Sequence, residues 1–216
     1  MEWLFQFDVE GYRAINVESR QSWLDPIMIG FSESGLGHFV IFGILLLIMF
    51  KQTRPYVIPL LSAFVVSGLV RLVMFMVIAR QRPSNYSWAS PLEGTFGNSS
   101  FPSGHATTAM AVAFMAIFLT WGTRKAYLGW IVMGWAAIVA YSRIYVGVHY
   151  PLDIVGGICL GFICAVIVYL LMDHFEKLPT QRFDRDLDRA LDAGMTAKIP
   201  PVQESFADSQ SRSQSE

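Results

Sequence analysis

The chain is poor in charge: Asp, Glu, Lys and Arg make up 15% of its 216 residues, against about 25% in a typical soluble domain. The formal net charge is −1, and this lack of a basic excess argues against a nucleic-acid partner. Its only cysteines, Cys159 and Cys164, point to different faces of one helix, so redox chemistry is not indicated. The N-terminus lacks a basic start before an apolar run, so no cleavable signal peptide is expected.

In place of charge, the sequence has long apolar runs. A helix that crosses a bilayer needs roughly 20 apolar residues, with a range of about 17 to 25. We therefore predict an all-α, polytopic membrane helix bundle with five transmembrane helices. A sixth span within the first 25 residues is the alternative. The predicted spans are residues 26–50, 57–79, 106–122, 126–142 and 154–172.

Basic residues in the connections predict the orientation of these spans. Residues 51–55 and 123–125 carry Lys and Arg and fall on the same side of a five-span bundle, as does the C-terminal segment. We expect that side to be cytoplasmic, so that connections 80–103 and 143–153 face outward. The first 25 residues hold more acidic than basic residues, which suits the outer side.

The two ends of the chain differ in character from the spans. Apolar positions from Trp3 to Ile15 predict a helix that lies in the membrane interface. We assign residues 1–175, with this N-terminal segment, to one membrane-embedded domain. Residues 176–216 form a polar cytoplasmic tail, which we expect to be largely disordered apart from a short helix at 183–191.

The outward connections gather cationic and titratable side chains at one membrane face. A phosphoryl group explains this gathering, because guanidinium groups match the geometry of its oxygens. The third span begins at Gly104, and backbone N–H groups at a helix N-terminus donate to an anion. Glycine at that point also leaves room for close approach. The side chains concerned are Arg80, Arg82, Ser103, His105, Arg143, His149 and Asp153.

His149 and Asp153 have the spacing of a paired imidazole and carboxylate. Pro151 suits the first residue of a helix, so Asp153 falls in the first turn and can reach back to His149. Such a contact would hold the imidazole in one tautomer. His105 can then donate a proton to a leaving oxygen. Taken alone, the spacing of His149 and Asp153 is also explained by an ordinary helix cap. The concentration of such side chains at one membrane face favours a catalytic role.

Three stretches resemble the signature motifs of the type 2 phosphatidic acid phosphatase superfamily. They are RP at 82–83, PSGH at 102–105 and SRIYVGVHYPLD at 142–153. The resemblance extends over residues 25 to 172, and the second and third motifs together are highly specific. It implies a membrane enzyme that removes phosphate from a lipid.

The resemblance also implies a role for each motif residue. His149 would be the nucleophile that forms a phosphohistidine, Asp153 would support it, and His105 would protonate the leaving group. The family needs no metal and no other cofactor, which agrees with the lack of a carboxylate cluster suited to Mg²⁺. The residues expected to bind the phosphate are Arg82, Ser103, Gly104 and Arg143.

One position departs from the family pattern. The family has a Lys seven residues before Arg82, where this chain has Phe75, and Arg80 is the nearest substitute along the sequence. Arg71 is the only charge inside the second span, and an ionisable residue there needs a partner. We predict an ion pair with Glu33; the alternative is that Arg71 replaces the missing Lys as a phosphate ligand.

The layout is most similar to bacterial enzymes that act on lipid phosphates and pyrophosphates outside the inner membrane. Undecaprenyl pyrophosphate and phosphatidylglycerol phosphate are the leading substrates, so the expected partners are a lipid phosphate and membrane lipids. A lipid phosphotransferase and a non-catalytic lipid-phosphate binding or transport protein are the alternatives. Small residues spaced four apart in GICLG, 157–161, let helices approach closely, inside the bundle or, alternatively, in a homodimer.

Overall fold

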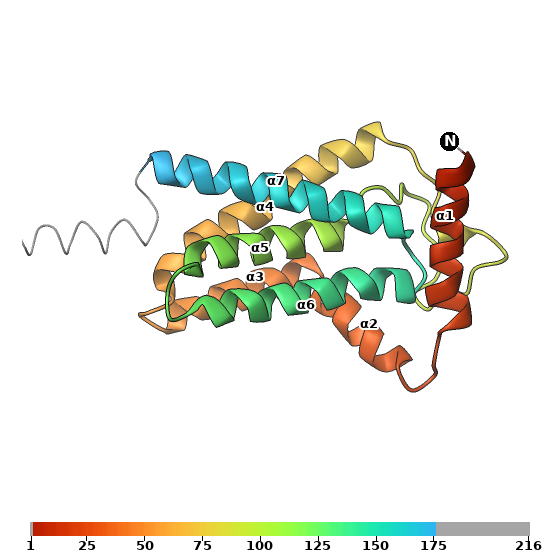
Figure 1. The fold of residues 1–216 in the computed structure, drawn as a ribbon, viewed down its shortest axis with the longest axis horizontal. Helices are drawn as coiled ribbons and strands as arrows, with labels where there is room; N and C mark the ends of the chain where they lie inside the picture. The colour runs from red at the N-terminus through yellow and green to blue at the C-terminus, as the bar shows by residue number, and fades with distance from the viewer. Residues whose placement is uncertain (1, 176–216) are drawn as a thin grey trace, which may run out of the picture. The chain divides into compact units, whose positions relative to one another are not determined.

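In the computed structural model, residues 2–175 are described, and within that range the chain is helical and contains no strand. The predicted tail, 176–216, lies outside the described residues. The long helices α4 to α7 run side by side, and the shorter α1 lies across one end of them (Figure 1). The helices are α1 (Glu2–Arg13), α2 (Asp25–Ser34), α3 (Gly37–Leu46), α4 (Arg54–Val77), α5 (Gly104–Thr120), α6 (Ala126–Tyr145) and α7 (Pro151–His174), with single turns η1 (Ala14–Glu18), η2 (Leu47–Met49) and η3 (Pro83–Asn85).

Three helices, α4, α6 and α7, are long and apolar enough to cross a membrane. The pair formed by α2 and the segment Gly37–Met49 passes the same test together, and α5 is apolar but only 17 residues long. The described residues therefore contain three candidate spans, or four with the bent pair. This confirms that residues 2–175 form an all-helical bundle with candidate membrane spans, while the number of five spans stays a prediction.

The first predicted span, 26–50, is wrong as a continuous helix, because α2 and α3 meet at a bend of 68°. The bend lies where the backbone packs directly against other helices. A Cβ atom on Gly35 would come within 2.5 Å of Val139 Cγ1 and 3.1 Å of His105 Cδ2. Before the bend, α2 packs against α6. After the bend, α3 packs against α4.

Helix α5 lies at the centre of the bundle and packs against α4, α6 and α7 (Figure 1). Glycines on α7 permit its closest approach: a Cβ on Gly157 would come within 3.0 Å of Ser103 O, and one on Gly161 within 2.6 Å of Thr107 O. The small-residue spacing at 157–161 thus serves the bundle interior, as we expected. These contacts hold the N-terminus of α5 beside the start of α7.

The two ends of the bundle have different interiors. We call the end where α5 and α7 begin and α4 and α6 finish the pocket end. Toward the opposite end, buried aliphatic side chains form one cluster. Exposed apolar side chains along α4, such as Ile58 and Met76, have no protein neighbours to cover them, which is typical of a surface that faces lipid. The buried cluster contains Val40, Ile44, Val57, Leu60, Ala63, Val112, Met115, Ala116, Leu119, Val168 and Met172.

Helix α1 has one buried face, and the rest of its surface is exposed. Trp3 is 71% exposed and Phe7 is 60% exposed, whereas Asp8 and Tyr12 are fully buried against the pocket end. Asn16, one turn further along in η1, is also fully buried. Asp8, Tyr12 and Asn16 therefore face the protein, whereas the apolar Trp3 and Phe7 are exposed together with charged residues such as Glu10.

Candidate active site

A pocket of about 370 Å³ opens at the pocket end of the bundle. Its walls come from the bend between α2 and α3, from the outer turns of α4, α5 and α6, and from the connecting loops. Ser103 and Asp153 are fully buried and stand behind the wall. The predicted site residues that line the pocket are Arg82, Gly104, His105, Arg143 and His149, and Arg71 joins them.

His149 lies in the short connection between α6 and α7, and its ring is buried. Backbone N–H groups of Val148 and His149 donate to Arg143 O at 3.2 and 3.3 Å, which folds the connection back on the end of α6. Gly147 has a φ of +88°, and a Cβ there would meet Tyr12 Oη at 2.9 Å. A glycine is therefore required for the turn that places His149 in the pocket wall.

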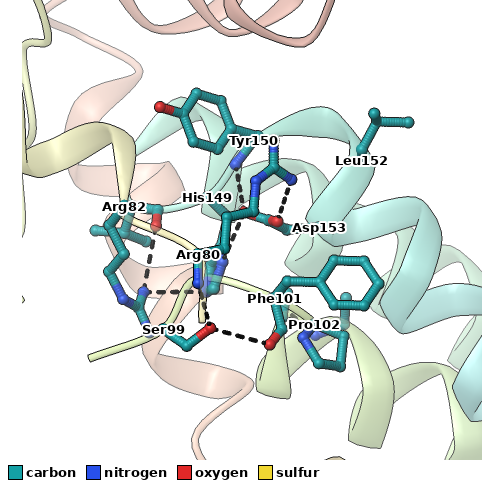
Figure 2. A network of polar contacts seen from close by, with 12 residues as sticks. Arg80, Arg82, Ser99, Phe101, Pro102, His149, Tyr150, Leu152 and Asp153 are labelled. Carbon is teal, nitrogen blue, oxygen red and sulfur yellow. Dashed lines mark hydrogen bonds and ion pairs between the residues drawn. The ribbon is translucent and has the colours of Figure 1, made fainter. Parts of the chain in front are cut away.

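The neighbours of His149 define its tautomer. Arg82 Nη1 is 3.2 Å from His149 Nε2, and Asp153 Oδ2 is 3.5 Å from His149 Nδ1. Because a guanidinium can only donate, Nε2 must be the acceptor, and the ring proton lies on Nδ1 facing Asp153. Figure 2 shows the polar contacts around Arg80, Arg82, His149 and Asp153. The lone pair of Nε2 is therefore directed toward Arg82, which lines the same pocket.

The pKa of His149 is lowered from 6.5 to about 4, mainly because burial disfavours the charged ring. Arg82 and Arg143 lower this pKa further, while the hydrogen-bonding and Coulombic influence of Asp153 raises it. The imidazole is therefore neutral at pH 7. Neutral imidazole is the form that can act as a nucleophile.

Arg82 reaches the pocket from the loop after α4 and is buried. Its Nε donates to Asn98 Oδ1 at 2.9 Å, and its Nη1 donates to Val148 O at 3.2 Å. Burial lowers the pKa of Arg82 to about 10, and the nearby Arg143 and Arg71 add to the effect. The side chain is still charged at neutral pH and is held rigidly beside His149.

Arg143 lies in the last turn of α6, where the sequence analysis expected a connection. Its Nη1 donates to both carboxylate oxygens of Glu93 at 2.9 Å, and also to Ser32 Oγ. Glu93 is therefore an anionic partner that the sequence analysis did not identify. A carboxylate and a phosphate make similar contacts with a guanidinium, so Glu93 lies where it could be exchanged for a substrate oxygen.

The N-terminus of α5 points into the pocket. Ser103 is its N-cap, with Oγ accepting from Ala106 N–H at 3.5 Å. His105 follows in the first turn, and its Nε2 is buried without a hydrogen-bond partner among the described residues. A buried, unpartnered ring nitrogen at a helix N-terminus is available to exchange a proton with a bound group.

The predicted Glu33–Arg71 ion pair is wrong. Glu33 is exposed on α2. This helix, which precedes the bend, packs against α6 rather than against α4. Arg71 instead reaches the start of α5: its Nε is 3.4 Å from Pro102 O, and a Cβ on Gly104 would lie 3.2 Å from the same nitrogen. Its guanidinium carbon also stands 4.5 Å from the centre of the Phe75 ring.

Arg71 thus lies in the pocket beside the residue that occupies the family's Lys position, which favours the alternative that we weighed. The signal in the sequence was its isolation as the single charge of an apolar run. Arg80, which the sequence analysis took as the nearest substitute, is directed elsewhere. It forms ion pairs with Asp8 and Asp153, the second with a distance of 2.6 Å between Nη1 and Oδ1.

Residues 56–177 match the PAP2 superfamily, which is more than half of the chain. The chain belongs to the PAP2 superfamily. This confirms the family that the RP, PSGH and SR…H…D motifs predicted. In this PAP2 protein, the residues of all three motifs come together around one pocket, although they are separated by as many as 71 positions in the sequence.

Several named relatives of this PAP2 protein are phosphatases. It is 36% identical to an undecaprenyl-diphosphatase of Sulfolobus acidocaldarius over 72% of this chain and 73% of the relative. It is 30% identical to phosphatidylglycerophosphatase B of Bacillus subtilis over 73% of this chain and 78% of the relative. The crystal structure of a transmembrane PAP2 type phosphatidylglycerolphosphate phosphatase from B. subtilis superposes with a TM-score of 0.69, at 27% identity, over 81% of this chain and 88% of that one.

Within residues 2–175, no group of three or more His, Cys, Asp or Glu side chains is placed to hold a metal ion. The pocket of this PAP2 protein is lined instead by guanidinium groups and a helix N-terminus. Metal-independent activity stays a prediction, and it is tested below.

Proposed function

We propose that this protein is an integral membrane lipid phosphatase that hydrolyses a lipid phosphate or pyrophosphate through a phosphohistidine on His149. The observation that carries the proposal is the pocket itself. Neutral His149 faces the guanidinium groups of Arg71, Arg82 and Arg143 and the N-terminus of α5. Such a set can hold a phosphoryl group and attack it, and family membership supports the same reaction.

In the first step, Nε2 of His149 attacks phosphorus, and the bond between phosphorus and the leaving oxygen breaks. Protonated His105 gives its proton to that oxygen, which leaves as a lipid alcohol or as a lipid monophosphate. Asp153 Oδ2 lies 3.5 Å from Nδ1, where it can accept a hydrogen bond as the ring becomes charged and can stabilise that positive charge. The guanidinium groups stabilise the charge on the transferring oxygens.

In the second step, water attacks the phosphohistidine. His105, now neutral, takes the proton from the water, and the bond between phosphorus and Nε2 breaks. Inorganic phosphate is released, and His149 returns to its neutral form. Arg143 uses only Nη1 for Glu93, and its buried Nε has no hydrogen-bond partner among the described residues, so Nε could donate to a phosphate oxygen while Glu93 stays bound.

The substrate class follows from the relatives and from the position of the pocket. The named relatives act on undecaprenyl pyrophosphate and phosphatidylglycerol phosphate, and we propose a substrate of this class. The pocket adjoins the bend between α2 and α3, where apolar side chains such as Phe64 share the wall with the arginines. A lipid whose head group enters there could keep its chains in the bilayer.

We further propose five crossings: the bent pair α2–α3 and helices α4, α5, α6 and α7. Although α5 is short, α4, α6 and α7 surround it, so it need not match the bilayer by itself. Helix α1 would lie in the interface with Trp3 and Phe7 in the lipid. The basic connections 51–55 and 123–125 support our proposal that the pocket end lies at the outer face of a bacterial inner membrane, with residues 176–216 in the cytoplasm.

The test measures phosphate release by the purified full-length protein in detergent micelles. Undecaprenyl pyrophosphate, phosphatidylglycerol phosphate and phosphatidic acid are supplied in turn, with EDTA and, separately, with vanadate. We expect turnover of at least one lipid that persists in EDTA and is inhibited by vanadate, which can mimic the transferring phosphoryl group. Loss of activity in EDTA that Mg²⁺ restores would overturn the metal-independent mechanism.

Two variants give the test its control. His149→Ala should release no phosphate, whereas His38→Ala, which removes an exposed histidine of α3 outside the pocket, should behave as the parent protein. Substrate labelled in the transferred phosphoryl group should leave an acid-labile label on the parent protein and none on His149→Ala. Transfer of the label to an added lipid alcohol, without phosphate release, would identify a phosphotransferase instead.

A further inference from the structure

Three buried polar side chains form one stripe along the N-terminal segment. Asp8, Tyr12 and Asn16 are spaced four residues apart, and all three are fully buried. Asn16 Nδ2 donates to Tyr145 O at 2.7 Å, and Tyr12 Oη donates to Gly147 O at 3.2 Å. The stripe therefore follows the end of α6 and the connection that carries the nucleophile.

Asp8 completes this stripe with an acceptor for the start of α7 and for Arg80. Its Oδ1 accepts from Leu152 N–H at 2.8 Å, and its Oδ2 accepts from Arg80 Nη2. Burial raises the pKa of Asp8, and the hydrogen bonds from Arg80 and Leu152 oppose that rise. An ionised carboxylate that is buried to this degree lowers the stability of the fold unless its partners compensate its charge.

Arg80 joins Asp8 to the carboxylate behind the nucleophile. Its Nη1 donates to Asp153 Oδ1 at 2.6 Å, which leaves Asp153 Oδ2 to accept from Tyr150 N–H at 2.9 Å and to face His149. The Arg80 guanidinium also lies 4.5 Å from the centre of the Tyr150 ring. Its backbone is fixed as well, because Ser100 N–H donates to Arg80 O at 2.8 Å.

We infer that Asp8 and Arg80 are positioning residues, which orient Asp153 for its contact with His149 and set how much negative charge that carboxylate presents to the imidazole. Neither touches the pocket, so neither is a catalytic residue. This inference rests on the proposed function, because it assigns how the nucleophile of that reaction is held. It gives the interfacial helix α1 a direct connection to the reacting group.

The electrostatic consequence can be followed through the groups that face His149. They are Asp153 from α7, Arg82 from the loop after α4, Arg143 from α6 and His105 from α5. Arg80 partly neutralises Asp153, and Asp8 in turn partly neutralises Arg80. Removing each charge should therefore change the stability of the His149 imidazolium, and the two changes should have opposite signs.

The experiment compares Asp8→Asn and Arg80→Gln in the full-length protein with the best lipid substrate of the parent protein. We expect kcat to fall about 10- to 100-fold in both, since a misplaced reactive group loses rates of that order. The acid limb of kcat/KM should move to lower pH in Asp8→Asn, because Arg80 then acts uncompensated on Asp153. It should move to higher pH in Arg80→Gln, because Asp153 then stabilises the imidazolium more strongly.

Matched controls separate this effect from a general loss of charge. Glu10→Gln removes an exposed carboxylate from the same helix, and Arg20→Gln removes another arginine that is paired with an aspartate, Asp25. Both should keep the kcat and the acid limb of the parent protein. Arg80→Lys keeps the positive charge but cannot hold both carboxylates in one fork, so it should recover part of kcat with an acid limb close to that of the parent.

The inference is overturned if Asp8→Asn and Arg80→Gln leave kcat unchanged. It is also overturned if the acid limbs of kcat/KM stay in place or move in the same direction in the two variants. A lower thermal stability with unchanged kcat per folded molecule also overturns it, because that result is what a purely structural contact gives. If Asp8→Asn and Arg80→Gln do not fold, Arg80→Lys decides, and full retention of kcat refutes the inference. An inactive parent protein would instead refute the proposed function, before any variant is made.

Discussion

The pocket end and the opposite end of the bundle bury different kinds of side chain. At the pocket end, Arg82, Arg143, His149 and Asp153 are buried together, and Glu93 and Asp153 provide the balancing charge. At the opposite end, the buried cluster of α3, α4, α5 and α7 is aliphatic, apart from the methionine sulfur atoms. The same helices therefore bury charged groups, which lower stability, at the pocket end and aliphatic groups, which raise stability, at the opposite end.

The difference shows where function and stability are located. Buried charges need specific partners, and removing one partner leaves an uncompensated charge. Aliphatic side chains need only volume and close packing, so their removal leaves a cavity but no change in the chemistry. Changes at the pocket end should alter turnover first, and changes at the opposite end should alter stability first.

The largest effect is expected for His149→Ala. Without the nucleophile, the phosphohistidine cannot form, so kcat should fall by more than about 10³-fold. Thermal unfolding in detergent should change far less than for a variant of the aliphatic cluster. Residual turnover above a few per cent of the parent rate would remove His149 from the nucleophilic role.

Leu119→Ala tests the opposite end. The Leu119 side chain is 1% exposed within the aliphatic cluster, so its truncation should cost about 2–4 kcal/mol of unfolding free energy. The kcat per folded molecule should stay within twofold of the parent protein. A large fall in kcat at unchanged stability would show that the two ends are not separate in this way.

Arg71 should have an intermediate effect. Hydrogen bonds to charged groups contribute about 1.5–3 kcal/mol, so Arg71→Gln should lower kcat/KM about 10- to 100-fold, and Arg71→Lys should recover part of it. Equal kcat/KM for Arg71→Gln and the parent protein would exclude Arg71 as a phosphate ligand. Measuring both kcat and KM shows whether binding or the chemical step is affected.

The pH dependence should reflect the buried state of His149. Its pKa is lowered from 6.5 to about 4, so the acid limb of kcat/KM should fall well below the pH at which a free imidazole titrates. As the pH falls from 6.5 toward 4, the unfolded chain binds the proton first, so stability is full above this range and is lost across it. Rate and thermal unfolding measured between pH 4 and 8 check both expectations; an acid limb at 6.5 would contradict the first.

The smallest effect is expected for Glu33→Gln. Glu33 is exposed and the structure does not pair it with Arg71, so stability should change by no more than about 0.5 kcal/mol. A double variant with Arg71→Gln should show additive changes in thermal stability. A coupling between the two positions would restore the ion pair that the sequence predicted.

Much of this molecule follows from local sequence. Apolar runs of sufficient length predict the helices, because a chain in lipid must satisfy its backbone hydrogen bonds within each segment. The start of α5 at Gly104 and of α7 at Pro151 follow from Ser103 as N-cap and Pro151 in the first turn. The resemblance of the three motifs to those of the PAP2 superfamily indicated the family and the residues that lie around one pocket.

The tertiary structure decided which charges meet. At the bend, the backbone of Gly35 comes close to Val139 of α6, and α2 packs against α6, so Glu33 does not meet Arg71. Arg71 and Arg80 contact different groups, and their positions in the sequence relative to Phe75 do not predict this. A long, flexible side chain contacts whichever partner the packing of the helices brings within its reach. Sequence determines which segments form helices and which groups can react, since both depend on near neighbours; the pairing of buried charges depends on how helices far apart in the chain pack together.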